Sequence, residues 1–362
     1  LRYSGKKVGK FTSPHLVSVT ERIEINGQEV SDSTLAGAVE FVDERVSANG
    51  LNDCSQFEIL FAAALMVFYA EKTDIAVIEA GIGGTLDCTN VITPQVSVIT
   101  SIGYDHIPLL VNPEIDIPPL YQIALQKSGI IKPNIPLVAT PHADREIANI
   151  FAQISMQNHS RFYFPEFNGN TDYKTSLFGN EFVYEGEKYN TKMGGLRQIY
   201  NAVTAIKALW VLGVRYDCVK RAIEQTVIPA RLQVVSQSPL IVLDGAHNED
   251  GLQAAFELFN ACTPRKRAVI TGFSRLKDVS SNARAVLDGV QLSRLFVVTD
   301  FDPNALGERE VRAIFNLENK GRAVYAEYIT VADIKRVFAE NKGHAFLVTG
   351  SLYLAGKVIP LL

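Results

Sequence analysis

Residues able to bind metal ions and phosphate groups stand directly after short apolar runs in this sequence. They are Thr12 with the three residues after it, Glu79, the pair Asp105 and His106, and the segment 244–248. Apolar runs of this length are typical of strands, and open parallel sheets bind their ligands beyond the carboxyl ends of the strands. These four groups are therefore the candidate site residues.

Glu79 follows the apolar run 75–78 and precedes glycines at positions 81, 83 and 84. A hard cation such as Mg²⁺ prefers carboxylate and phosphate oxygens as ligands. Glycines let a backbone approach a bound ligand closely. The same pattern also suits a carboxylate that accepts backbone N–H groups at a helix start, and both interpretations stay open.

The other groups are weaker when each is taken alone. His106 suits a metal ligand or a hydrogen-bonded structural histidine. Lys127 lies in the run 126–129, and because a lone lysine is usually solvated, it indicates little by itself. Asp244 to Asn248 lie where a strand gives way to a helix, which is the geometry that places N–H donors on a phosphate. The alternative there is a capped helix with a surface histidine.

Strands and helices alternate around these residues. In the N-terminal part we expect strands at 8–12, 74–79, 96–100 and 136–140, and a helix at 55–72 capped by Ser55 with Glu58 three residues later. This alternation predicts a mostly parallel sheet with helices on both faces.

A second α/β region follows a β-rich segment. The segment 162–193 has a turn at Glu185 and Gly186, and helices are expected at 197–212, 217–226 and 249–260. Further strands are expected at 240–243, 267–271, 295–299, 322–328 and 345–349. We expect two domains, 1–232 and 233–362, of which the second is smaller.

Bulk composition excludes several classes of protein. The chain has 362 residues, more than one hydrophobic core usually holds. Its net charge of −4 gives no sign of nucleic-acid or membrane partners. The four cysteines have no CxxC spacing, which argues against a disulfide framework or zinc site and favours a reducing compartment. The longest apolar run, 59–70, is too short to cross a bilayer, and without a signal peptide a cytoplasmic protein is expected.

The motifs together resemble a known family. In chain order they are 12–16, 21–23, 57–58, 79–90, 102–106, 127–133, 201–202, 230–232, 244–248 and 349–353. This ordered set resembles the Mur ligases that act on folates, the folylpolyglutamate synthase and dihydrofolate synthase family. The resemblance implies a Mur-ligase-like α/β fold, with a mostly parallel-sheet domain that binds ATP and folate in 1–232 and a smaller Rossmann-like domain in 233–362.

The resemblance also implies roles for single residues. Mg²⁺ would be held by Ser13, Glu79 and His106, and ATP by Asn201, Arg231, Asp244 and His247. The pterin ring of the folate would be lined by Phe57, Leu86, Asp87 and Cys88. Lys127 would react with CO₂ to form a carbamate, and it would act with His247 in catalysis.

The implied activity is an ATP-dependent carbon–nitrogen ligase. A carboxylate of tetrahydrofolate or dihydropteroate would attack the γ-phosphate of ATP and become an acyl phosphate, from which L-glutamate would displace phosphate to form an amide. Phosphoryl transfer of this kind depends mostly on positioning and charge neutralisation. A monomer is expected.

Three features depart from the family pattern. Thr85 stands where the family has an arginine, and the segment between His106 and Lys127 is longer, with a proline-rich stretch at 112–119. The pattern GxxxxGK[ST] of a phosphate-binding loop does not occur in these residues.

In the family, the phosphate-binding loop lies just before a helix. Residues 1–7 of this sequence resemble the end of that helix. We therefore expect that activity and solubility require an upstream strand, loop and helix of roughly fifty residues. The alternative is a non-catalytic relative that binds folate or nucleotide. A cell-wall precursor ligase of the same superfamily fits the motifs at 13–16 and 244–248 less well.

Overall fold

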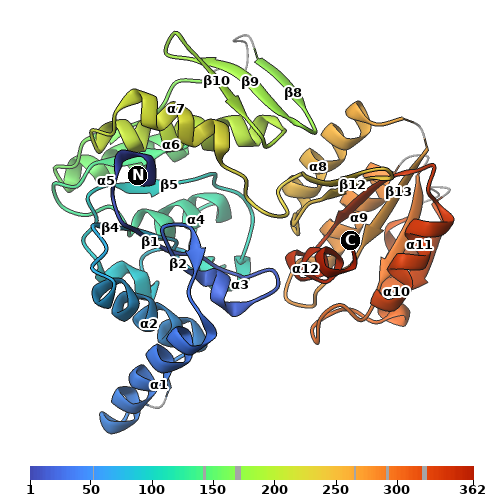
Figure 1. Ribbon diagram of the computed structural model, residues 1–362, viewed down its shortest axis with the longest axis horizontal. Coiled ribbons are helices and arrows are strands. Elements are labelled where there is room, and N and C mark those ends of the chain that lie inside the picture. The colour runs from blue at the N-terminus through green and yellow to red at the C-terminus, as the bar shows by residue number, and fades with distance from the viewer. Residues whose placement is uncertain (52, 142–143, 168–172, 265, 291–292, 320–323) are drawn as a thin grey trace. The chain divides into compact units, whose positions relative to one another are not determined.

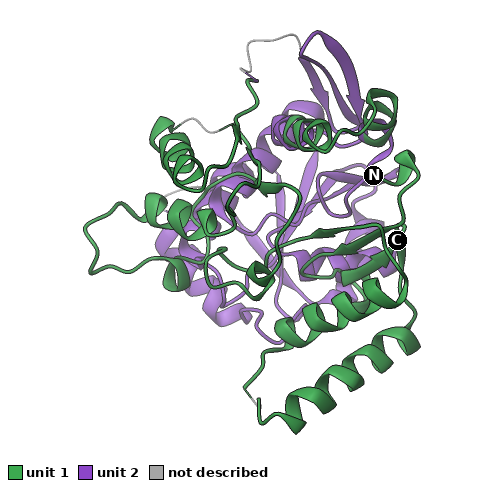
Figure 2. Cartoon of the chain, turned by 90° about the vertical axis from the view of Figure 1, so that its left-hand side faces the viewer, with its two compact units in different colours: residues 1–166, 203–222 green, residues 167–202, 223–362 purple. Residues whose placement is uncertain are grey.

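The computed structural model describes residues 1–51, 53–141, 144–167, 173–264, 266–290, 293–319 and 324–362. The chain forms two compact units, one of residues 1–166 and 203–222 and the other of residues 167–202 and 223–362 (Figure 2). The domain division expected between residues 232 and 233 stays a prediction. No helix among the described residues is long and apolar enough to cross a membrane.

The first unit contains a four-stranded sheet in the order β3-β2-β1-β4. Its strands are β1 (Val8–Phe11), β2 (Ile23–Ile25), β3 (Gln28–Glu29) and β4 (Ile75–Ile78). The strands β1 and β4 run parallel, with Phe11 opposite Ile78. The residues that follow these two strands therefore emerge side by side at one edge of the sheet.

Two long helices, α1 (Asp32–Ala48) and α2 (Gln56–Ala70), lie side by side in this unit (Figure 1). The capping box predicted for α2 is confirmed, because Ser55 Oγ accepts the N–H of Glu58 and Glu58 Oε2 accepts the N–H of Ser55 at 2.7 Å. Apolar side chains of α2 pack against Phe11 and Ile23 in one core.

A second, three-stranded parallel sheet also belongs to the first unit. It consists of β5 (Ser97–Ile99), β6 (Leu137–Ala139) and β7 (Phe162–Tyr163), packed with α3 (Ile107–Leu110), α4 (Pro119–Ser128) and α5 (Arg145–Gln157). We expected the strands before Ser13, Glu79 and His106 to share one sheet, and this expectation is wrong for the described residues. β4 and β5 are edge strands of different sheets, because no described strand pairs with both.

The second unit begins with a small antiparallel sheet of β8 (Tyr173–Ser176), β9 (Gly179–Tyr184) and β10 (Glu187–Thr191). The turn predicted at Glu185 and Gly186 is confirmed. Their φ angles of 48° and 81° match the left-handed turn that suits the twist of a two-residue hairpin. Part of the predicted β-rich segment, 168–172, lies outside the described residues. Leu177 joins the core of the second unit beside Val242 and Phe256.

A six-stranded sheet, parallel except at one edge, forms the centre of the second unit. Its order is β11-β12-β16-β13-β14-β15, with β11 (Gln233–Gln237), β12 (Leu240–Leu243), β13 (Arg267–Thr271), β14 (Arg294–Val298), β15 (Ala326–Ile329) and β16 (Ala345–Thr349). Helices α8 (Glu249–Cys262), α9 (Val279–Val290) and α10 (Glu308–Glu318) cover one face, and α11 (Ile334–Glu340) and α12 (Leu352–Val358) the other. Of the strand expected at 322–328, residues 322–323 lie outside the described residues. Helices α6 (Leu196–Val211) and α7 (Tyr216–Gln225), most of whose residues belong to the first unit, confirm the predicted ones.

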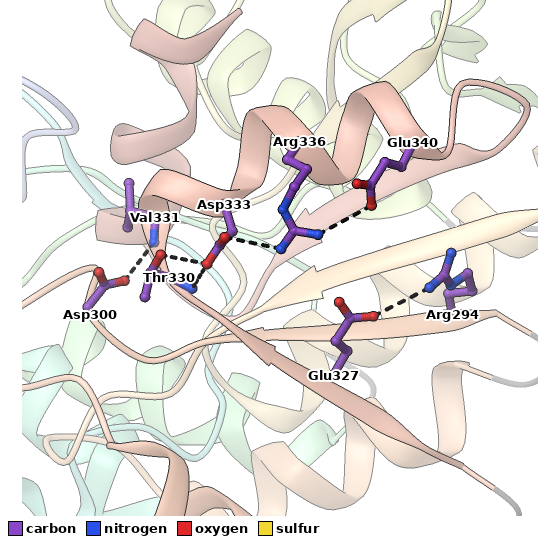
Figure 3. A network of polar contacts seen from close by, with 8 residues as sticks. All are labelled: Arg294, Asp300, Glu327, Thr330, Val331, Asp333, Arg336 and Glu340. Carbon is purple, nitrogen blue, oxygen red and sulfur yellow. Dashed lines mark hydrogen bonds and ion pairs between the residues drawn. The ribbon is translucent and has the colours of Figure 1, made fainter.

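Polar contacts fix the start of α11 beside the strands β14 and β15 (Figure 3). Asp333 Oδ2 accepts the N–H of Thr330 at 2.9 Å and its hydroxyl at 2.7 Å, and Arg336 donates to Asp333 Oδ1. These bonds lower the pKa of Asp333 to about 2. Arg294 pairs with Glu327 at 3.4 Å across the two strands. Exposed ion pairs stabilise a fold little, so this network chiefly orders the helix start.

Candidate active site

Ser13 and Glu79 come together at the carboxyl ends of β1 and β4. The backbone N–H of Ser13 donates to Glu79 Oε2 at 2.8 Å. The Ser13 hydroxyl makes no hydrogen bond within the described part of the chain. The Glu79 carboxylate and the hydroxyl of Ser13 both follow strand ends, and such oxygen ligands suit a hard cation.

These residues fit a magnesium ion better than a transition metal. No group of three or more His, Cys, Asp or Glu side chains among the described residues could hold a metal ion on its own. Mg²⁺ ordinarily takes one or two carboxylates and completes its coordination with water and substrate phosphates. The pair of Ser13 and Glu79 matches that requirement.

Asp87 organises the glycine loop that follows β4. Its Oδ2 accepts the N–H groups of Gly81 and Ile82, each at 2.8 Å, and its Oδ1 accepts the N–H of Thr89 at 3.0 Å. A Cβ added to Gly81 would lie 2.8 Å from the Phe57 ring and 3.0 Å from Asp87. Phe57 and Asp87, both expected near the pterin, therefore both lie close to Gly81, around the position that its Cβ would occupy.

The other two residues expected near the pterin, Leu86 and Cys88, differ in how far their side chains are exposed. The Leu86 side chain is 90% exposed, so the described structure gives it no enclosing pocket. Cys88 is half-buried at the border of the core formed by α1 and α2. The contact of both with a pterin stays a prediction.

Burial raises the pKa of the Cys88 thiol to about 11, and the negative charges of Asp87 and Glu58 add to this effect. At pH 8 its thiolate population should be about a hundredfold below that of an unperturbed cysteine. We therefore expect iodoacetamide to modify the exposed Cys262 much faster than Cys88 at pH 8, as followed by peptide mass spectrometry. Equal modification rates at the two cysteines would contradict the raised pKa of Cys88. A modification rate that rises more steeply towards pH 10 for Cys88 than for Cys262 would support it.

The glycine loop is bonded to the end of α4. The N–H and the hydroxyl of Thr85 both donate to the carbonyl of Gln126, at 2.9 and 3.0 Å. A Cβ at Gly84 would lie 2.8 Å from the carbonyl oxygen of Lys127. Thr85, which replaces the family's arginine, therefore fixes the helix end that carries Lys127.

Lys127 is half-buried in a region that also contains acidic groups. Burial lowers the pKa of its amine, and the charges of Asp105 and Asp87 oppose that effect. The lower pKa increases the neutral fraction of the amine, which is the nucleophilic form. The loops after β4 and β5 therefore both act on Lys127.

His106 begins α3 with a left-handed backbone, at a φ of 53°. Its backbone N–H donates to Asp105 Oδ1 at 2.9 Å, and its ring nitrogen Nε2 lies 3.9 Å from Asp105 Oδ2. The expected role of His106 as a metal ligand stays a prediction.

In the second unit Asp244 holds the turn that carries Arg231. The carboxyl group of Asp244 is buried, and it accepts the N–H groups of Leu232 at 2.8 Å and Ala246 at 2.9 Å. Burial raises the pKa of Asp244, whereas these bonds and the charge of Arg231 lower it. Ala230 and Leu232 have φ angles of 52° and 46°, so Arg231 stands between two strained residues.

His247 and Asn201 are placed differently with respect to this turn. His247 Nδ1 lies 2.9 Å from the carbonyl of Gly245, and Asn282 donates to the His247 carbonyl at 2.8 Å. The structure therefore brings His247, Asp244 and Arg231 into one short region. Asn201 is exposed on α6, where it donates to Gln198 at 3.2 Å, and its contact with ATP stays a prediction.

Comparison with known proteins identifies the family. Residues 230–352 match the family model described as "Mur ligase, glutamate ligase domain". The chain is 30% identical over 373 residues to the folylpolyglutamate synthase of Lacticaseibacillus casei, and the match covers 99% of this chain and 84% of that protein. The chain belongs to the folylpolyglutamate synthase family.

Two further similarities support this assignment. The chain is 29% identical to the dihydrofolate synthase/folylpolyglutamate synthase of Bacillus subtilis, over 99% of this chain and 84% of that protein. Its fold matches a folylpolyglutamate synthase of Mycobacterium tuberculosis, complexed with ADP and AMPPCP, with a TM-score of 0.85 at 23% identity, over 99% of this chain and 86% of that one. The predicted Mur-ligase α/β fold is confirmed, and the folylpolyglutamate synthase family makes this chain an ATP-dependent ligase.

Proposed function

We propose that this ligase joins L-glutamate to a folate at the expense of ATP, through an acyl phosphate on the folate carboxyl group. The observation that carries the proposal is the hydrogen bond between the Ser13 N–H and Glu79, next to the glycine loop that is bonded to α4. That loop joins an oxygen-rich cation site to the lysine at the end of the helix. Phosphoryl transfer to a carboxylate needs this combination of charges.

Ser13 and Glu79 would hold Mg²⁺, with His106 as a further candidate ligand. The ion, when bound, would neutralise charge on the phosphates of ATP. Arg231 and His247 would contact the nucleotide, together with Asn201. Asp244 supports the same site, since its carboxyl group holds the backbone on both sides of Arg231.

Phe57 and Asp87 form the part of the folate site that the geometry supports best. Phe57 presents its ring beside Gly81, where an aromatic heterocycle could stack. Asp87 keeps the loop backbone closed around the same glycine. Leu86 and Cys88 would complete this site.

Lys127 would act as a carbamate. The lysine ammonium would lose one proton to solvent, and the resulting neutral amine would attack the carbon of CO₂. A nitrogen–carbon bond would form as one C=O π pair moves to oxygen, and a second proton would pass to solvent, so that a cation becomes a carbamate anion. We expect Lys127→Ala to lose activity and to regain part of it with a short-chain carboxylic acid such as acetate, because that carboxylate would take the place of the carbamate. Steady-state rates with and without the acid measure the rescue.

Lys127→Arg provides the matched control, since its guanidinium keeps the positive charge and cannot form the carbamate. This variant should be inactive and should not respond to the acid. An inactive Lys127→Ala that no acid rescues, together with an unmodified lysine mass in the active protein, would argue for an ordinary phosphate-binding lysine.

The decisive assay is ATP-dependent incorporation of labelled L-glutamate into tetrahydrofolate or dihydropteroate, in the protein that contains this chain with any flanking residues retained. One ADP and one phosphate should appear for each amide formed. Binding of ADP and folate without amide formation would instead favour a non-catalytic relative. We further expect a monomeric, cytoplasmic protein, which sedimentation and cell fractionation would test.

A further inference from the structure

The side chain of Gln122 closes the base of the proline-rich loop at 112–118. Gln122 Oε1 accepts the N–H of Asn112 at 2.8 Å, and Gln122 Nε2 donates to the carbonyls of Asn112 at 3.1 Å and Ile117 at 2.9 Å. The side chain is buried on α4, with 7% of its surface exposed. Both amide protons and the amide oxygen are therefore used on the two ends of one loop.

This loop lies between two candidate site residues. His106 begins α3, the loop follows α3, and α4 carries Gln122 five residues before Lys127. Leu110 at the end of α3 packs in the core with Ile123 of α4, and a Cβ at Gly83 would lie 2.9 Å from the Leu110 side chain. A shift of α3 would therefore reach both the glycine loop and His106.

Apart from its contacts with Gln122, the loop forms few hydrogen bonds. Within it, Asn112 Oδ1 accepts the N–H of Glu114 and the Asn112 carbonyl accepts the N–H of Ile115. Ile115 and Ile117 stay exposed by 48% and 38%. The hydrogen bonds of Gln122 are thus the buried polar contacts that join this segment to α4.

We propose that Gln122 is a positioning residue that closes the base of the loop at 112–118 and so keeps His106 and Lys127 in register. This inference rests on the proposed function, because it assigns Gln122 an effect on the reaction. Its physical basis is that a flexible connection leaves the two elements it joins free to shift unless its two ends are held together. The hydrogen bonds of Gln122 hold the two ends of this connection on α4.

Hydrogen exchange tests the clamp without any activity measurement. In the unaltered protein the Asn112 amide should exchange slowly, because its N–H is held by a buried acceptor. In Gln122→Met, which loses the acceptor and both donors, the amides of Asn112 and Ile115 should exchange at least about tenfold faster. The Leu137 amide in β6 should not change. Rapid exchange of the Asn112 amide in the unaltered protein would overturn the clamp, whether or not the protein proves to be a ligase.

Kinetics of a double variant test the positioning role. Gln122→Met, which keeps the volume, should lower kcat about tenfold or more with little change in KM for ATP. Replacing residues 113–117 by a single glycine should make Gln122 dispensable, so that Gln122→Met then changes kcat less than about twofold. Gln153→Met, at an exposed glutamine of α5 whose side chain makes no hydrogen bond to the described residues, is the matched control. An equal loss of kcat in both backgrounds, or no loss in either, would overturn the positioning role.

Discussion

Glu79→Ala should lower kcat about 10²–10³-fold or more while the protein still folds, because the substitution removes the carboxylate that would hold the metal ion. In the structure this carboxylate accepts the Ser13 N–H at 2.8 Å at the edge of the sheet. The measurement is the steady-state rate of glutamate incorporation across a magnesium titration, with thermal unfolding recorded on the same samples.

Glu79→Gln separates the two roles that the carboxylate could have. An amide oxygen can still accept the Ser13 N–H, but it carries no charge for a cation. We expect Glu79→Gln to be nearly as inactive as Glu79→Ala and to melt like the unaltered protein. Glu71→Gln, at a surface carboxylate paired with Lys7 at 2.7 Å, should leave the rate unchanged. High activity of Glu79→Gln would make Glu79 an anchor for the backbone of Ser13 and not a metal ligand.

Asp244→Ala should destabilise the second unit by about 2–6 kcal/mol, because two buried N–H groups would lose their acceptor at about 1–3 kcal/mol each. Those groups belong to Leu232 and Ala246. The expected loss in Tm is about 4–24 °C, at about 2–4 °C per kcal/mol for a unit of this size. The turn around Arg231, with its left-handed neighbours, should be the first part to lose its conformation.

Asp250→Ala is the matched control for this prediction, since Asp250 is an exposed aspartate in the first turn of α8. Its loss should cost no more than about 1 kcal/mol, the usual contribution of a charge at a helix start. Calorimetry resolves the two variants. A Tm of Asp244→Ala equal to that of Asp250→Ala would show that the carboxyl group of Asp244 does not hold the turn.

Local features of the fold could be predicted well from the sequence. Ser55 and Glu58 predict the start of α2, and the pair Glu185 and Gly186 predicts a hairpin turn. Both signals depend on neighbouring residues alone. Most apolar runs locate their strands to within one or two residues, whereas the strand expected at 322–328 begins only at Ala326. Strand partners could not be predicted in this way, and the assignment of β5 to the same sheet as β4 was wrong, because pairing depends on residues far apart in the chain.

The candidate site was predicted by residue type but not by the role of each side chain. Asp87 and Asp244 were expected to face ligands, and in the structure their oxygens accept backbone N–H groups. A carboxylate at a strand end has the same sequence signature in both cases. Gln122 and Asn282 were missed, because a polar residue within a helix normally faces solvent, and only the fold of the adjoining segments buries these two.

The hairpin tip at Glu185 and Gly186 gives the protein a convenient point for attaching a probe. Both residues are exposed, and a side chain added at Gly186 would meet no atom within 4 Å. Exposed tips of this kind tolerate inserted residues. A fluorophore or peptide tag placed there would mark the second unit without altering any residue between 228 and 248, so purification and imaging need not interfere with the chemistry.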